Sequence, residues 1–260
     1  MVRSLMLGAC AALFSATSAF ALLPEPLEQA LSAPINEPVA ARVDMRIGVN
    51  NDRIMVRMVE SEAGESDYTL LAPPEDTLNE AQRELWVDLS DDDESDESSE
   101  DSDESSGFGA EGFDPEEIRR IIGDDVRFLR EEDGRLIYGF VPLAMPDSEG
   151  EPDRTEQRML EAMQGEVHVN AANGHVQAFH LRLEESVKPN FAARIDGFQF
   201  LQDFVFDETV NGPRLAGMHF NIAGSAAFQS FDENMTIEIL DVEWAAPTAG
   251  GSVVEATESH

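Results

Sequence analysis

The chain has 260 residues, of which 53 are acidic and 17 basic, and its formal net charge is −36 at pH 7. Such a charge repels the phosphates of nucleic acids and anionic membrane surfaces, so we exclude DNA and RNA as partners. Hydrophobic residues make up 42% of the composition, which is enough to build at least one core in a chain of this length.

The first 21 residues have the three parts of a secretory signal peptide. Arg3 supplies the positive charge, residues 4–18 are mostly small and apolar, and Ala19-Phe20-Ala21 is a small-x-small cleavage site. We therefore predict a cleaved signal peptide over 1–21 and a periplasmic location.

Cys10 is the only cysteine, and it lies inside this predicted signal. Lipoprotein anchoring at Cys10 is disfavoured, because the apolar stretch before it, residues 4–9, is shorter than the usual ~7–15 residues. A membrane anchor is disfavoured because the apolar run is short and Pro24 and Pro26 follow it. We expect no transmembrane segment. Once the signal is cut, no cysteine remains for a disulfide, a thiol nucleophile or a metal site.

Alternating apolar and polar residues predict a β-hairpin in the first part of the mature chain. The expected elements are a short helix over 26–31, strands over 43–49 and 54–58 joined by a turn at 50–52, a strand over 68–71 and a helix over 77–87. Basic residues fall on the solvent side of the hairpin.

An acidic tract follows. Residues 90–106 are only Ser, Asp and Glu, and ten of these seventeen residues are acidic. Like charges repel and nothing apolar anchors the tract, so we predict a disordered loop over 89–112 that acts as a solvated spacer. It interrupts a single domain over 22–250, and a flexible tail follows over 251–260. No calcium-binding loop pattern is present, so the tract would hold divalent cations only loosely.

The second part of the chain begins with a strong helix start at Asp114-Pro115-Glu116-Glu117. A hairpin over 126–130 and 136–141, a helix over 155–163 and a hairpin over 166–170 and 176–184 are expected next.

Long alternating strands are predicted from Phe191 to the Asn211-Gly212-Pro213 turn, over 215–228 and over 235–244. The apolar residues switch between odd and even numbers at Gly197 and again near Leu240. Each switch predicts a β-bulge or bend at that point. Bends of this kind curl a sheet. The predicted fold class is α+β: a strongly curved antiparallel sheet, or half-barrel, with a few short helices on its concave face.

This layout resembles the LolA-like superfamily of periplasmic lipoprotein carriers and their outer-membrane lipoprotein-sorting relatives. The resemblance is carried by the N-terminal hairpin, the intervening helical stretch, the run Gly165 to Asn170 with Asn173-Gly174, and the final meander. It implies an apolar cavity between sheet and helices that holds acyl chains. The acidic tract departs from the pattern of that family.

We predict a non-enzymatic exported protein that binds a lipid or a lipoprotein acyl chain on the apolar face of the meander. The candidate ligand-binding residues are Phe198, Phe200, Phe204, Phe206, Met218, Phe220, Ile222 and Phe228. The alternative is a structural or interaction protein of the envelope, in which these side chains fill a core and the acidic loop meets divalent cations or cationic partners. Nucleophile-elbow, phosphate-loop and zincin motifs are absent from the sequence, so no catalytic residues are assigned.

Two histidines are the candidates for a metal site. If Val167 pairs with Leu181, His168 lies opposite His180 on the polar face of the hairpin over 166–184. Two imidazoles on neighbouring strands can share a metal ion. The pattern fixes no acid beside them, so a solvated polar pair is the simpler interpretation, and no metal or other cofactor is assigned.

Overall fold

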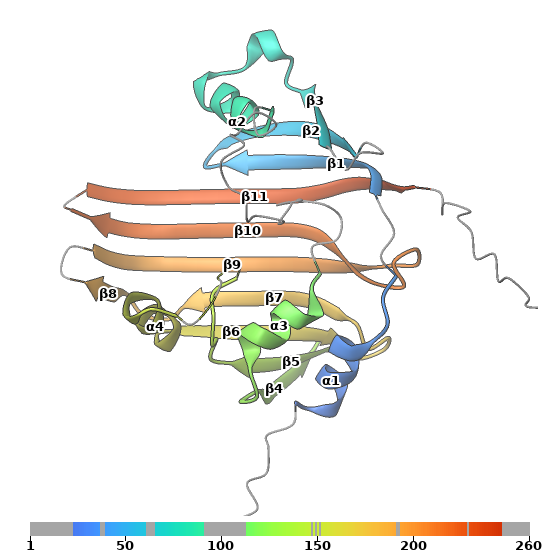
Figure 1. Ribbon diagram of the computed structural model, residues 1–260, viewed down its shortest axis with the longest axis vertical. Coiled ribbons are helices and arrows are strands. Elements are labelled where there is room, and N and C mark those ends of the chain that lie inside the picture. Colours follow the sequence, from blue (N-terminus) through green and yellow to red (C-terminus); the bar gives the residue numbers. More distant parts are fainter. Residues whose placement is uncertain are drawn as a thin grey trace, which may run out of the picture.

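The protein is a single open antiparallel sheet with short helices packed on it (Figure 1). The structure is a computed structural model that describes residues 23–36, 40–60, 66–90, 113–146, 148, 150, 152–190, 193–227 and 229–245. The predicted signal peptide and tail, and most of the predicted acidic loop, lie outside these residues.

Eleven strands form the sheet, and every described pair of neighbours is antiparallel. The strands are β1 Ala40–Val49, β2 Asp52–Glu60, β3 Ser66–Ala72, β4 Arg127–Glu132, β5 Arg135–Phe140, β6 Met163–Asn170, β7 Val176–Leu183, β8 Val187–Asn190, β9 Ala193–Asp207, β10 Gly212–Ala226 and β11 Gln229–Trp244. Their order is β3-β2-β1-β11-β10-β9-β7-β6-β5-β4, and β8 pairs with β9. The N-terminal hairpin is therefore joined to the rest of the sheet by the last strand of the chain.

Four short helices are described. They are α1 Glu25–Ser32, α2 Glu80–Ser90, α3 Pro115–Ile122 and α4 Arg154–Glu161, and a turn of 3-10 helix, Glu75–Thr77, precedes α2. Figure 1 shows α2 at the end of the sheet that holds β2 and β3, while α1, α3 and α4 lie at the end that holds β5 to β7. None of the helices in the described part of the chain is long and apolar enough to cross a membrane.

The sequence located most elements correctly, but the bounds of two helices were wrong. The predicted helix over 77–87 begins at Glu80, because Asn79 and Gln82 form a reciprocal cap between side chains and backbone NH groups, at 2.9 and 3.1 Å. The predicted helix over 155–163 ends at Glu161, and Met163 is already the first residue of β6. The short strand β8 was not predicted.

Both predicted breaks in strand pairing are present. Between β9 and β10 the register shifts beside Gly197, and between β1 and β11 it shifts beside Leu240. Further shifts, among them one beside Ala216 of β10, were not predicted. A bulge inserts one extra residue into a strand. The apolar side chains therefore stay on one face although they switch between odd and even residue numbers.

The apolar face carries two separate clusters of buried side chains. The first core lies under α1 and α3 and contains Leu27, Ala30, Leu31, Phe113, Ile118, Ile121, Ile122, Tyr138, Phe140, Met163, Val167, Val169, Val176, Phe179, Leu181, Phe198, Phe204 and Leu215. The second core lies on β1 and β2 and contains Ala40, Val43, Met45, Ile47, Ile54, Val56, Met58, Leu78 and Ile237. The antiparallel α+β class is thus confirmed, with helices at both ends of the apolar face.

Candidate functional site

The apolar face is continuous across the central strands. Phe200 of β9 pairs with Phe220 of β10, which in turn pairs with Met235 of β11. Residues directly opposite each other on antiparallel strands share a face, so these three side chains form one row. Rows of this kind join the first core to the second.

Three of the described helices, α1, α2 and α4, make their main strand contacts away from this middle region. α2 packs against β2 and β3, α1 against β6, and α4 against β6 and β8. We call the half-buried apolar side chains between the two cores the central strip; its members are Phe200, Met218, Phe220, Ile222, Met235 and Ile239. The strip is therefore packed from its two sides and only partly covered by the described residues.

The eight predicted ligand-binding residues fall in different environments. Phe198 and Phe204 are buried in the first core, where Phe204 meets Phe113 edge to face with ring centroids 5.2 Å apart. Phe206 is 46% exposed, with its ring 4.6 Å from that of His175. Four more belong to the central strip: Phe200, Met218, Phe220 and Ile222. The eighth, Phe228, lies outside the described residues.

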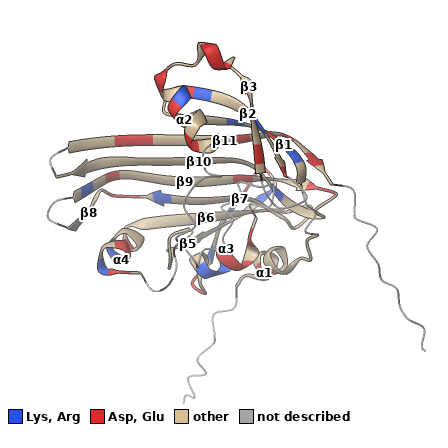
Figure 2. Cartoon of the chain, turned by 45° about the horizontal axis from the view of Figure 1, so that its top comes forward, with Lys and Arg blue, Asp and Glu red and all other residues tan. Residues whose placement is uncertain are grey.

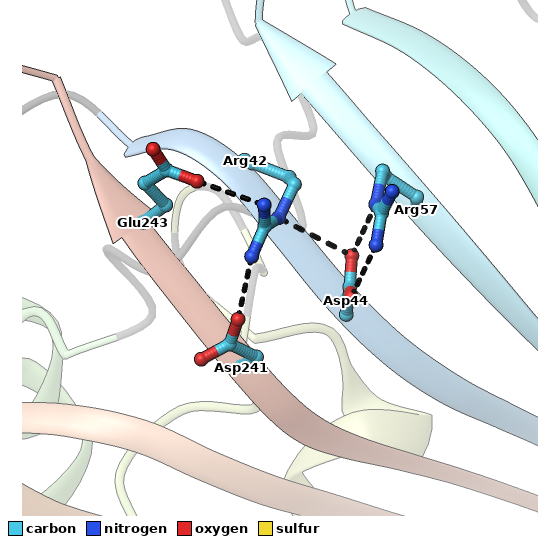
Figure 3. Close-up of polar contacts among 5 residues, drawn as sticks. All are labelled: Arg42, Asp44, Arg57, Asp241 and Glu243. Carbon is cyan, nitrogen blue, oxygen red and sulfur yellow. Dashed lines mark hydrogen bonds and ion pairs between the residues drawn. The ribbon is translucent and has the colours of Figure 1, made fainter.

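The opposite face of the sheet is polar and carries charges of both signs (Figure 2). On β1, β2 and β11 these charges form a ladder across three strands (Figure 3). Asp44 accepts two hydrogen bonds from Arg57, at 2.7 and 2.8 Å, and the bond from Arg57 lowers the pKa of Asp44. Arg42 reaches Asp241 at 2.6 Å and Glu243 at 2.8 Å. The ladder pairs its own charges, so it stabilises the β2-β1-β11 junction instead of offering a free site for a ligand.

A second polar group lies on β6 and β7. The rings of His168 and His180 are 4.9 Å apart between centroids, so the two candidate histidines do meet on the polar face. Their predicted pairing was wrong: Val167 pairs with Phe179, and His180 is opposite Glu166. The shift is two residues, and an even shift leaves each side chain on its original face.

Acidic side chains accompany these histidines. Oε2 of Glu166 is 3.0 Å from Nε2 of His168, and Oδ1 of Asp203 is 3.8 Å from Nε2 of His180. Glu166 was missed, although it lies two residues before His168 on the same strand and must share its face. Asp203 could not be found, because it comes close only through the pairing of β7 with β9.

Burial and charge set the protonation of this group. Burial lowers the pKa of His168, and it outweighs the opposing effect of the Glu166 carboxylate. Burial raises the pKa of Glu166, but hydrogen bonds from His168 and Arg130 reverse this and lower it overall. The group therefore tends toward a neutral His168 beside an ionised Glu166, and the ionised Glu166 also forms an ion pair with Arg130 at 3.1 Å.

A small open depression adjoins the histidine pair. It is lined by Gln164, Glu166, His180, Arg182 and Glu184 and has a volume of about 60 Å³. That volume admits a few water molecules or a hydrated ion, whereas pockets for drug-sized ligands have volumes of roughly 300–1,000 Å³.

Comparison with protein-family models gives no match, and neither the curated proteins nor the solved structures compared with the chain match it significantly.

Proposed function

We propose that the protein is an exported, non-enzymatic periplasmic protein that binds the acyl chain of a lipid or lipoprotein against the central strip. The observation that carries this proposal is the incomplete burial of the strip between two cores that are themselves well packed. Exposed apolar surface of this kind is costly in water, roughly 25 cal/mol for each Å².

The composition of the strip suits an acyl chain. Phenylalanine provides broad apolar surface, while Met218 and Met235 have flexible thioether side chains that adapt to varied apolar guests. The proposal includes a LolA-like arrangement in which the sheet curves strongly and its helices lie on the concave side. The bulges beside Gly197 and Leu240 support curvature, since bulges bend strands.

Native mass spectrometry of the protein released gently from the periplasmic fraction tests this function. We expect a species with a bound lipid mass, and a polypeptide that begins after Ala21. Titration of the delipidated protein with a fluorescent fatty acid should then give saturable binding.

Phe220→Ala should weaken that binding about tenfold or more, because it removes a ring from the middle of the strip. Phe128→Ala is the matched control, since Phe128 lies on the edge strand β4 and is 54% exposed. Circular dichroism of both variants verifies that they are folded. Only bare polypeptide in the native spectrum, or equal fatty-acid binding by the two variants, would favour the filled-core interaction protein instead.

A further inference from the structure

We propose that Glu166, His168 and His180 form a binding site for one divalent transition-metal ion of the Zn²⁺ class on the polar face of the sheet. Each of the three residues offers one ligand atom, and these atoms all lie within 4.8 Å of one another. The site is on the face opposite the central strip and is independent of lipid binding.

One of the separations already fits a shared ion. Ligand atoms at the usual ~2.0–2.1 Å from a tetrahedral zinc are about 3.3 Å apart, and Oε2 of Glu166 is 3.0 Å from Nε2 of His168. His180 lies directly across the strand pair from Glu166, so its ring approaches from the neighbouring strand. Small rotations of side chains, without movement of the backbone, would close the three atoms around an ion.

His168 has an unsatisfied nitrogen that points independently to a ligand. The residue is 7% exposed, and its Nδ1 is buried without a hydrogen-bond partner among the described residues. A buried polar atom without a partner loses its hydrogen bonds to water and gains none in return, so native proteins rarely retain one without a reason. Nε2 is the nitrogen that lies 3.0 Å from Glu166, so coordination through Nε2 leaves Nδ1 without a partner, whereas coordination through Nδ1 after the ring turns would satisfy it.

Outer charged groups flank two of the three residues. Arg130 bonds Oε1 of Glu166 at 3.1 Å and leaves Oε2 for the site, while Asp203 lies 3.8 Å from His180. Such outer partners orient metal ligands and fix the tautomer of a histidine. The depression beside Glu166 and His180 has room for water to complete the coordination.

The donor set selects the class of metal. Two imidazoles and one carboxylate suit Zn²⁺ and its neighbours in the first transition row, whereas Ca²⁺ and Mg²⁺ prefer sites made only of oxygen. The preference for Zn²⁺ distinguishes the site from the acidic tract over 90–106, whose carboxylates would attract any divalent cation weakly.

The test uses the full chain with Cys10→Ser, so that no thiol is present whether or not the predicted signal peptide is retained. Co²⁺ is titrated in excess Mg²⁺, which occupies the exposed carboxylates, and visible absorption distinguishes four-coordinate Co²⁺ from the hydrated ion. Zn²⁺ then displaces the Co²⁺, which gives the stoichiometry and the affinity. We expect one equivalent of Co²⁺ per chain with a four-coordinate spectrum.

His180→Ala and Glu166→Gln should each weaken Zn²⁺ binding tenfold or more. His219→Ala is the matched control: His219 lies on the polar face of β10, and Leu201 of β9 separates it from His180. Thermal unfolding without metal verifies that each variant is folded. If His180→Ala does not fold, the isosteric variant Glu166→Gln still tests the site. Equal Zn²⁺ affinity in Glu166→Gln and His219→Ala, or only the spectrum of hydrated Co²⁺, would overturn the proposal.

Discussion

At the scale of single residues, Gly165 and Gly197 differ in what surrounds them. A Cβ on Gly165 would overlap the buried ring of Phe140, which stacks on Phe179 with centroids 5.8 Å apart. A Cβ on Gly197 would meet nothing within 4 Å, and the backbone there has no positive φ. Nothing in these surroundings therefore requires glycine at this position, although the predicted bulge is present.

Gly165→Ala should destabilise the protein by about 1–3 kcal/mol, because Phe140 must leave its packed position in the first core. Gly197→Ala should change the free energy of unfolding by less than about 0.5 kcal/mol. Urea unfolding of both variants measures the difference. Equal stabilities would show that the ring of Phe140 moves aside without loss of packing.

Asp44 gives the polar ladder a predictable response to pH. Because the hydrogen bond from Arg57 lowers its pKa, Asp44 stabilises the fold above its ordinary titration range. That stabilisation is lost as the pH falls through the lowered pKa. Asp44→Asn should therefore cost about 1 kcal/mol at neutral pH, and the difference from the natural protein should shrink as the pH falls below the ordinary aspartate pKa of about 3.9.

Urea unfolding at neutral and acid pH measures this change. Glu132→Gln is a suitable control, since the carboxylate of Glu132 is 59% exposed and its ion pair with Arg130 should contribute little. A difference between Asp44→Asn and the natural protein that persists undiminished in acid would contradict the assignment.

At the scale of elements, local chemistry explains which predictions succeeded. Asp114 caps α3 by accepting hydrogen bonds from the backbone NH groups of Glu116 and Glu117, as the sequence indicated. The alternation of apolar and polar residues located the strands and both predicted bulges. Successive side chains of a strand point to opposite faces whatever the strand pairs with, so this signal is local. The register of β6 on β7 was predicted wrongly, since an even shift satisfies the same alternation.

The whole molecule combines two cores on one sheet, and its two tryptophans report on only one of them. Trp86 and Trp244 both pack against the second core. Strands β10 and β11 join the cores, with Phe220 packed against the first and Met218 against the second. We therefore expect the two cores to unfold together.

Leu181→Ala tests this coupling. Leu181 is fully buried in the first core, so the substitution should cost about 2–5 kcal/mol. If the molecule unfolds cooperatively, the tryptophan fluorescence of the distant second core should shift to lower urea with the circular dichroism. A fluorescence midpoint that stays in place while the dichroism moves would show two independently unfolding halves.

The sequence alone determined the strand periodicity, the antiparallel class, the capped helix and the one apolar face of the meander. These follow from each residue's neighbours along the chain. Only the tertiary structure decided that β11 pairs with β1, that the predicted phenylalanines divide between a core and the central strip, and that Asp203 joins His180. Such contacts bring together residues far apart in sequence, and many strand orders satisfy the same local pattern. Packing of the whole chain selects among them.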